Sequence, residues 1–355
     1  MLRIIAKIKM RWHKRWWLCY ATDFRSLMYP CFICSRILGI FPYKLNISTF
    51  EFSKSYYILS TIIICILCVI NLVFIDNIIK SKLNGNQVWI IHAVIYYIFT
   101  NFIVIITHFL SGPRMRLLQT IMEVSSKLHS KSYQKLSRLI HVKDILSNII
   151  RVVQLTIILS KLELENKFFT ILIEISTIYF GLSVLQIIML YINCVCVLKA
   201  CFKRIDDNLV HMQKIVINDM KPRVSNVICH TQRNQFLLIE LRILKKQHLM
   251  ISNAVQMLNI IFNLQLLAAL VMSFLIVTFE LYSYTIRWQN GVLIGLDWHF
   301  FDVLVTSQTY NIFQIILIVW ACETGKNQAQ NIGTTIHDLL NSTNDKKIKY
   351  EVATL

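Results

Sequence analysis

Six long apolar stretches, separated by polar connections, dominate the pattern of this chain. They run over about residues 56–74, 88–110, 145–160, 168–198, 252–282 and 301–320. A helix needs about 20 mostly apolar residues to cross a bilayer, and most of the stretches reach that length. The pattern therefore predicts an all-α, polytopic transmembrane helical bundle with six spans.

The stretches differ in apolar character and in length. Residues 145–160 form the least apolar one, because they include Arg151 and Gln154. Residues 168–198 and 252–282 exceed one bilayer thickness, so part of each helix should project from the membrane. The basic connection over residues 111–143 has apolar positions at helical spacing, which predicts an amphipathic helix there.

Lysine and arginine alternate between rich and poor segments. Ten precede the first stretch, the five connections hold 2, 7, 2, 10 and 1, and four follow the last stretch. Connections rich in these residues stay in the cytoplasm. The amino terminus should therefore lie inside, and the chain should end inside after six crossings.

Composition supports a membrane protein with one domain over residues 1–355. Hydrophobic residues make up 55% of the chain and the mean hydropathy is +0.55, more than one soluble core needs. The net charge of +18 is concentrated in the inward connections, where the anionic headgroups of a lipid bilayer attract it. Nucleic acid is therefore not an expected partner.

No catalytic, cofactor or metal signature is present in the sequence. It has no HExxH, no phosphate-binding glycine loop and no GxSxG, so we expect neither an enzyme nor a bound cofactor. Cys31 and Cys34 form a CxxC pair without a second pair, which favours two reduced thiols over a metal site.

Four amide side chains of the fifth stretch share one helix face. Asn253, Gln256, Asn259 and Asn263 are spaced by three, three and four residues. A polar face within a membrane helix is expected to contact protein rather than lipid.

Several local patterns resemble one family. The segment Arg36-Ile-Leu-Gly-Ile-Phe-Pro-Tyr43 resembles the LGxxP segment of insect gustatory receptors, and the stretch from Leu258 to Tyr282 resembles their fifth helix. Residues 336–340 and 347–352 are similar to the family's approach to its last helix. The resemblance implies a tetrameric or heterotetrameric, tastant-gated cation channel of the plasma membrane.

One departure from the family concerns its pore. In the family, a seventh helix with a TYxxxxxQF signature lines the ion pathway, whereas this sequence stops at Leu355, and Thr309-Tyr310 followed by Gln314 has different spacing. We expect a form that lacks the seventh helix, from a truncated gene model, a pseudogene or an isoform.

Two other classes remain as alternatives. A G-protein-coupled receptor would have its amino terminus outside, which the charge distribution disfavours. A transporter would have helices broken at mid-membrane, but the prolines at positions 30, 42, 113 and 222 all lie outside the predicted spans.

The resembled receptors hold their ligand in the outer half of the bundle. In this sequence that region contains aromatic and hydrogen-bonding side chains that suit a small organic ligand. The candidates are His92, Tyr96, Tyr97, Tyr179, Glu280, Asp302 and Gln308. For each of them, an interfacial or helix-to-helix contact is the alternative.

Two charged residues fall within the neighbouring third and fourth predicted spans. Arg151 and Glu174 lie on neighbouring helices at depths that differ by about 3 Å, at 1.5 Å per residue. A charge within the bilayer is costly without a partner, so we expect an ion pair between them. The alternative is that Arg151 extends toward the inner surface and Glu174 faces water.

Overall fold

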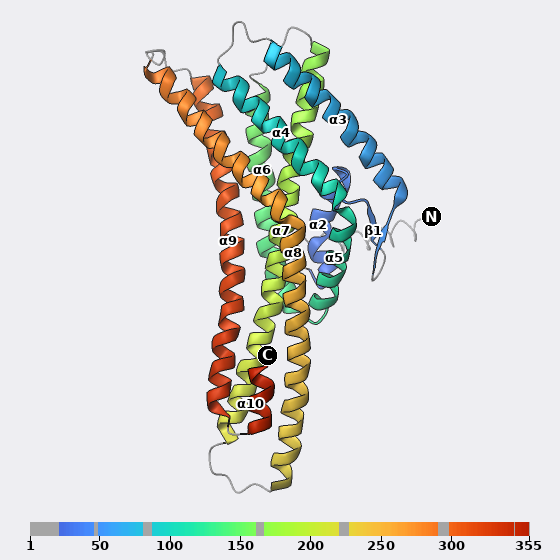
Figure 1. Ribbon diagram of the computed structural model, residues 1–355, viewed down its shortest axis with the longest axis vertical. Helices are drawn as coiled ribbons and strands as arrows, with labels where there is room; N and C mark the ends of the chain where they lie inside the picture. The colour runs from blue at the N-terminus through green and yellow to red at the C-terminus, as the bar shows by residue number, and fades with distance from the viewer. Residues whose placement is uncertain are drawn as a thin grey trace, which may run out of the picture.

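A computed structural model describes residues 21–45, 49–80, 87–160, 167–219, 227–289, 298–343 and 345–354. Those residues form long helices and one small hairpin (Figure 1). The elements are α2 (Phe24–Ile37), β1 (Tyr43–Leu45), β2 (Phe50–Phe52), α3 (Lys54–Lys80), α4 (Gln87–Phe109), α5 (Ser111–Ser125), α6 (Ser130–Leu159), α7 (Lys167–Asp219), α8 (Val227–Gln289), α9 (Trp298–Ser342) and α10 (Lys346–Ala353).

Each predicted span coincides with a helix or part of one, namely α3, α4, α6, α7, α8 and α9 in chain order. Within the described residues, five helical stretches are long and apolar enough to cross a membrane: Lys54–Lys80, Ile90–Phe109, Ile171–Ile217, Gln235–Ile286 and Phe301–Ser342. The third predicted span, in α6, is not among them because it is more polar. The all-α membrane bundle predicted from the sequence is confirmed.

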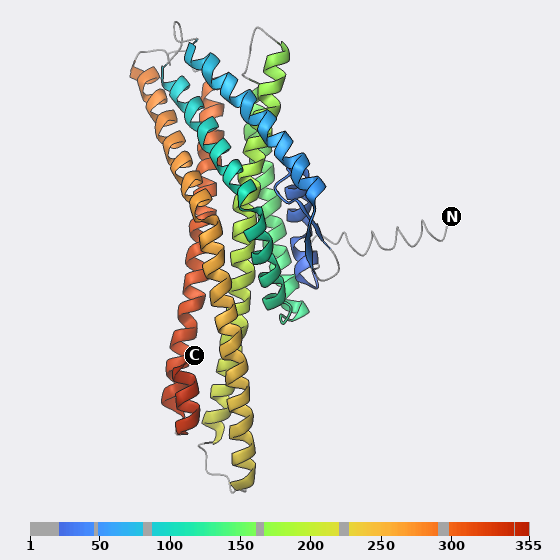
Figure 2. The same cartoon turned by 45° about the vertical axis from the view of Figure 1, so that its right-hand side comes forward.

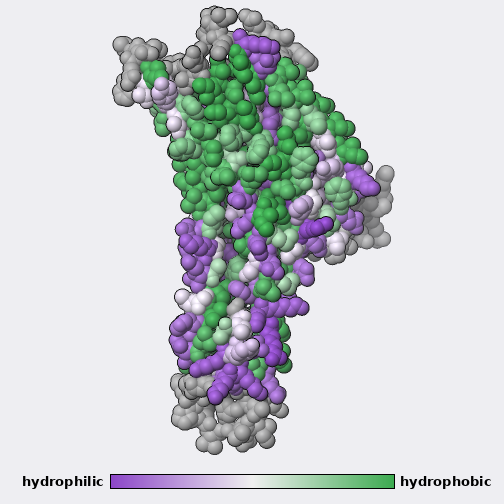
Figure 3. Space-filling model, viewed as in Figure 1, coloured by the Kyte–Doolittle hydropathy of each residue, from purple (hydrophilic) through white to green (hydrophobic). Residues whose placement is uncertain are grey.

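The helix ends are sorted to two ends of the bundle. The ends of α3, α6 and α8 and the starts of α4, α7 and α9 lie together at one end, the upper end in Figures 1 and 2. Toward the opposite end, α7, α8 and α9 extend past α2 to α6 as a narrow stalk, which α10 joins. The surface of the upper half is largely apolar and that of the stalk is largely polar (Figure 3). We call these the apolar half and the basic half.

Helices of the apolar half bury polar side chains and expose apolar ones. On α6, Arg151 and Gln154 are buried whereas Val152 and Val153 are about half exposed. On α9, Asn311 is buried and Ile312 is exposed. This inverted pattern is what a bundle surrounded by lipid requires, because polar groups need protein partners there. It also explains why α6 is less apolar than the other spans.

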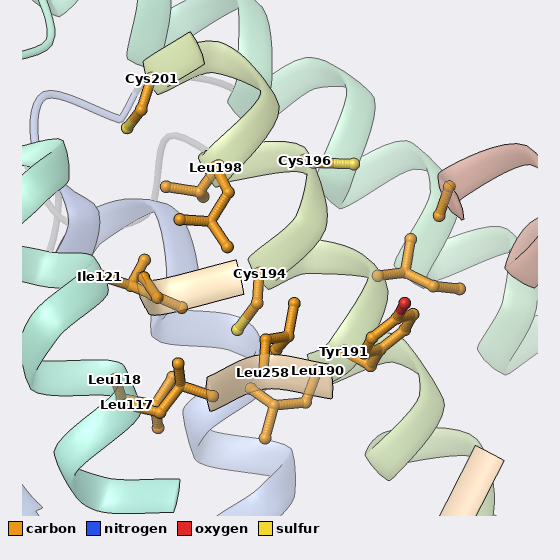
Figure 4. Packing of buried hydrophobic residues seen from close by; sticks show 14 of the residues in the cluster. Leu117, Leu118, Ile121, Leu190, Tyr191, Cys194, Cys196, Leu198, Cys201 and Leu258 are labelled. Atoms are coloured by element: carbon orange, nitrogen blue, oxygen red, sulfur yellow. The ribbon is translucent and has the colours of Figure 1, made fainter. Parts of the chain in front are cut away.

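Helix α7 lies at the centre of the bundle and packs against α4, α6, α8 and α9. Figure 4 shows Leu117, Leu118 and Ile121 of α5 facing Leu190 and Cys194 of α7, with Leu258 of α8 beside them. All these side chains are at most 2% exposed. The amphipathic character predicted for residues 111–143 is confirmed, although the segment is divided between α5 and the first part of α6.

Helix α2 and the hairpin form a side unit against α5, α6 and α7. Asp23 caps α2 by accepting a hydrogen bond from the Ser26 amide, which satisfies one of the free amides of the first turn. The helix ends at Ile37, and Gly39, just after the C-cap residue Leu38, has a φ of 70°, which favours glycine. The Ser60 hydroxyl of α3 donates to the Gly39 carbonyl over 2.7 Å, and this bond ties the corner to the first span.

The amide face predicted to contact protein points out of the bundle in this single chain. Asn253, Gln256, Asn259 and Asn263 are all exposed on α8 in this single chain. The reason is that α8 packs inward through larger apolar contacts, with Ala254, Leu258 and Phe262 buried. The amide stripe occupies the opposite side of the helix, so this prediction is wrong for the isolated subunit.

The last helix, α10, returns to the basic half and packs against α8 and α9. Asp345 caps it through the Lys347 amide. Ile348 and Val352, four residues apart, are buried. An exposed ion pair between Arg242 and Glu351 joins it to α8 at 2.9 Å, and a pair of that kind contributes little compared with the two buried side chains.

Candidate ligand cavity

A cavity of about 220 Å³ lies between α4, α6, α7, α8 and α9 in the apolar half. Most of its wall is apolar, and α8 and α9 contribute Met272, Ile276, Phe279 and Val303. The polar lining is concentrated at a few positions: His92, Tyr96, Tyr97, Thr100, Arg151, Gln154, Thr177, Glu280, Ser283, Ser307 and Asn311. A largely apolar cleft or cavity with a few polar groups is the usual form of a small-molecule site.

Arg151 is the central charge of the cavity and is only 4% exposed. Its Nη1 donates to the Gln154 side-chain oxygen over 2.5 Å, and its Nη2 donates to the Tyr96 hydroxyl over 3.0 Å. The guanidinium carbon lies 4.4 Å from the centre of the Tyr310 ring, at which distance a ring face attracts a cation. Its Nε is buried and makes no hydrogen bond.

Glu280 forms a second polar centre, on α8. Its carboxylate accepts hydrogen bonds from the Ser307 hydroxyl at 2.6 Å and from the Gln308 amide at 2.8 Å. His92 of α4 places its Nε2 at 3.5 Å from the same carboxylate. The Glu280 carboxylate is therefore hydrogen-bonded to α9 and lies beside His92 of α4.

A hydrogen-bonded chain connects these two centres. The Gln154 amide donates to Ser307 at 3.4 Å, and Ser307 in turn donates to Glu280. Arg151 and Glu280 are thus joined through Gln154 and Ser307 rather than in direct contact. Because the four side chains come from α6, α8 and α9, the network fixes these helices relative to one another.

The tyrosines of α4 attach that helix to α7. The Tyr97 hydroxyl shares a hydrogen bond of 2.7 Å with the Thr177 hydroxyl. Tyr96 donates to the Thr177 carbonyl over 3.4 Å while accepting from Arg151. Both rings line the cavity as well. The two tyrosines therefore hold α4 against α7 and also form part of the cavity wall.

Four of the seven candidate ligand residues line this cavity, namely His92, Tyr96, Tyr97 and Glu280. Gln308 lies behind the wall and holds Glu280 and the Val277 carbonyl. Tyr179 points away from the cavity and donates to the Leu38 carbonyl at 3.0 Å. Asp302 is exposed near the start of α9.

The ion pair expected between Arg151 and Glu174 is not formed, and this prediction is corrected. Arg151 turns into the bundle toward Gln154, Tyr96 and Tyr310. Glu174 is half-buried and is not among the ion pairs of the described residues. The two residues lie at a similar depth on adjacent helices. Depth does not determine the direction in which each side chain points around its helix axis.

Sequence reasoning missed several lining residues, including Gln154, Thr177, Ser307, Tyr310 and Asn311. The signal available was the spacing of polar residues within apolar spans. Arg151 and Gln154 are three apart on α6, and Ser307 and Asn311 are four apart on α9, so each pair shares a helix face. Such a face within a lipid-embedded helix points inward.

The CxxC pair shows no metal-binding geometry. Cys31 is buried and its sulfur lies 3.0 Å from the donating Gln186 amide, whereas Cys34 is exposed. Burial raises the pKa of the Cys31 thiol well above the ordinary value, which disfavours the thiolate that binds metals. No group of three or more potential ligands occurs in the described part of the chain.

The fold resembles that of an insect olfactory receptor. The solved structure of the insect olfactory receptor OR5 from Machilis hrabei matches with a TM-score of 0.68 over 93% of this chain and 88% of that chain. The two sequences are 11% identical, so the likeness concerns the fold alone. No curated protein matches this chain by sequence.

The match to a protein family covers most of the chain. The family described as "7tm Chemosensory receptor" matches residues 28–353, which include every described helix except the first residues of α2. Its members are receptors of the plasma membrane that cross the bilayer several times, and they are not enzymes. The chain therefore belongs to the 7tm chemosensory receptor family.

Proposed function

We propose that this chain is a gustatory receptor subunit, a ligand-gated cation channel that detects small organic molecules. The observation that carries the proposal is the cavity with its buried network from Arg151 to Glu280. The expected topology, with the amino terminus inside, puts the cavity in the outer half of the bundle, within reach of tastants. The receptor family and the gustatory-like motifs around Gly39 and Leu258 support the same reading.

The lining selects a particular ligand chemistry. Arg151 has neutral partners only, and its buried Nε is free to donate. A ligand with a carbonyl, hydroxyl or carboxylate oxygen would supply the missing acceptor. The remaining wall offers Met272, Ile276 and Phe279 to an apolar body. The best ligand is therefore a small, largely apolar molecule that presents one oxygen acceptor.

Binding at this position would act on the helix contacts directly. Tyr96 belongs to α4, Arg151 to α6, and Ser307 to α9, and the network joins them through single hydrogen bonds. A ligand oxygen that accepts a hydrogen bond from Arg151 would weaken one of the hydrogen bonds between these helices and strengthen another. A ligand shifts a conformational equilibrium only through such differential contacts.

Assembly into a homo- or heterotetramer is part of the proposal. The exposed amides Asn253, Gln256, Asn259 and Asn263 form a stripe of hydrogen-bonding groups along α8. A second subunit against this stripe would give the amides partners, as polar faces of membrane helices require.

Cavity binding is tested with purified receptor and three probes of similar size: octanoic acid, 2-octanone and octane. The two oxygen-bearing probes should raise the melting temperature more than octane does. Ile276→Trp fills the cavity and should abolish this stabilisation. Ile260→Trp, on an exposed position of the same helix, is the matched control. Equal stabilisation of the Ile276→Trp variant would remove the cavity as the binding site.

Channel function is tested separately, in cells that express the receptor with and without other receptor subunits. A molecule that binds the cavity should evoke a cation current, and Ile276→Trp should shift the dose response to higher concentrations while Ile260→Trp leaves it unchanged. Cavity binding without current under both conditions would contradict the channel role and leave the binding site standing.

A further inference from the structure

A second pocket, of about 330 Å³, lies on the outside of α2 and β1, away from the ligand cavity. Three basic side chains line it, Arg25, Arg36 and Lys44. Tyr29, Phe32, Ile33 and Phe41 complete its wall. The pocket thus combines three positive charges, one phenol hydroxyl and an apolar floor.

The spacing along α2 explains how the pocket is built. Arg25, Tyr29, Phe32 and Arg36 occur at intervals of four, three and four residues, so they line one face of the helix. The two arginines are separated by about 16 Å along the axis, at 1.5 Å per residue. Lys44 reaches the same space from the hairpin.

Arg36 is held in a fixed position. Its Nη2 donates to the Tyr43 carbonyl over 2.5 Å, and its guanidinium carbon lies 5.5 Å from the centre of the Tyr56 ring, in the first turn of α3. A guanidinium fixed in this way keeps further donors for a phosphate, which it recognises through paired hydrogen bonds. The pocket therefore has a preformed anion-binding group.

The charged side chains that line the pocket in the described part of the chain are all basic. Glu51 lies opposite Lys44 in the hairpin register, yet the two form no ion pair in the structure. Asp23, two residues before Arg25, accepts a hydrogen bond from the Ser26 amide and caps α2. The described lining therefore carries three basic side chains and no acidic one.

Exposed apolar side chains occur on α2 and the hairpin, the two elements that form the pocket. Ile33, Ile37 and Phe52 are exposed, Ile37 by 78%. The pocket also lies where the first span begins, since Tyr56 of α3 contacts Arg36. Figure 3 shows the apolar surface giving way to polar surface at the height of α2. The positive charges thus lie at the edge of the lipid-facing surface, with apolar groups directed outward beside them.

We propose that this pocket binds the phosphate headgroup of an anionic phospholipid, with the acyl chains against Ile33, Ile37 and Phe52. A free phosphate would use the three charges but not the exposed apolar side chains. Anionic lipids are concentrated in the cytoplasmic leaflet, the side on which basic connections lie. The bound lipid would link α2, the hairpin and the start of α3.

The experiment measures lipid binding to purified receptor by native mass spectrometry, with dioleoyl phosphatidic acid as the probe. Dioleoyl phosphatidylcholine tests the need for net charge, and glycerol 3-phosphate tests the headgroup without acyl chains. The double variant Arg25→Gln/Lys44→Gln leaves the anchored Arg36 in place. Lys346→Gln/Lys347→Gln, on exposed positions of α10, removes the same charge far from the pocket.

Phosphatidic acid should bind more tightly than phosphatidylcholine, and glycerol 3-phosphate should bind weakly. The pocket variant should lose about 30-fold in affinity for phosphatidic acid, roughly fivefold for each charge removed. The α10 variant should bind as the unmodified receptor does. Lys44→Gln alone, on an exposed hairpin side chain, should give roughly a fivefold loss if the double variant is unstable.

Three outcomes would overturn the proposal. Equal losses in the pocket and α10 variants would mean general attraction to positive surface. Equal binding of phosphatidylcholine would remove the anionic specificity. Equal binding of glycerol 3-phosphate and phosphatidic acid would identify a site for soluble phosphate rather than for lipid.

Discussion

Gly181 of α7 makes room for the guanidinium of Arg151 on α6. A Cβ atom at position 181 would lie 2.1 Å from Nη2 of Arg151 and 2.9 Å from Cζ. A Cβ atom does not approach another side chain this closely, so the guanidinium can occupy this position only because residue 181 lacks a side chain. The glycine thus leaves space for the guanidinium between the two helices at the level of the cavity.

Replacing Gly181 with alanine should destabilise the receptor by about 1–3 kcal/mol, the usual range for overpacking a tight interior. The melting temperature of the purified protein and its delivery to the cell surface should both fall. Gly333→Ala is the matched control, because a Cβ there meets nothing within 4 Å. Alanine favours a helix over glycine, so the control should be neutral or slightly stabilising.

Shortening the arginine should relieve part of that loss. The double variant Gly181→Ala/Arg151→Gln reduces the clash. Its loss of unfolding free energy should therefore be smaller than the sum of the losses in the two single variants. Strict additivity would mean that the two side chains do not interact, and the geometry described above would then be incorrect.

Tyr97→Phe removes one hydroxyl without changing the shape of the ring. The hydroxyl bonds Thr177 at 2.7 Å and is buried, so its loss should reduce the free energy of unfolding by about 1 kcal/mol. Tyr350→Phe, at a residue that is 70% exposed, should have no measurable effect. Thermal unfolding of both variants gives the comparison, and a silent Tyr97→Phe would indicate that α4 and α7 are held by apolar packing alone.

Gly39→Ala should destabilise the junction between α2 and the hairpin. Its φ of 70° costs a residue with a side chain about 1–2 kcal/mol, and its Cβ would lie 2.9 Å from Oγ of Ser60. The loss should appear as a lower melting temperature. Gly112→Ala, at an uncrowded helical position, is the comparison. Combining Gly39→Ala with Ser60→Ala should not restore stability fully, because the backbone strain remains.

The charge distribution predicts which half of the bundle faces the cytoplasm. Lys347→Cys in the basic half and Asp302→Cys near the start of α9 both replace exposed residues. A membrane-impermeant maleimide should label Asp302→Cys on intact cells and Lys347→Cys only after permeabilisation, relative to the native cysteines of the parent. The opposite labelling pattern would reverse the orientation.

The sequence alone determined the helical membrane bundle. Runs of about 20 apolar residues have few alternatives in a chain of this hydropathy, and the three connections poor in lysine and arginine separate helices whose ends meet at one end of the bundle. Local spacing also gave the amphipathic helices, because the buried faces of α5 and α10 repeat at three and four residues.

The site required the tertiary structure. His92, Tyr96, Tyr97 and Glu280 were identified from their type and level, and all four line the cavity. Level alone was insufficient for Tyr179, Asp302 and Gln308, whose rotation about their helix axes directs them elsewhere.

Rotation about the helix axis, and not depth, also decided the partners of Arg151. Sequence spacing sets the position of a side chain along its helix, at 1.5 Å per residue, but the packing of one helix against all its neighbours sets the direction in which it points. Gly181 lets the guanidinium enter the bundle between α6 and α7, where Tyr96 and Gln154 supply acceptors. That choice depends on side chains from four separate parts of the chain, and no local pattern contains it.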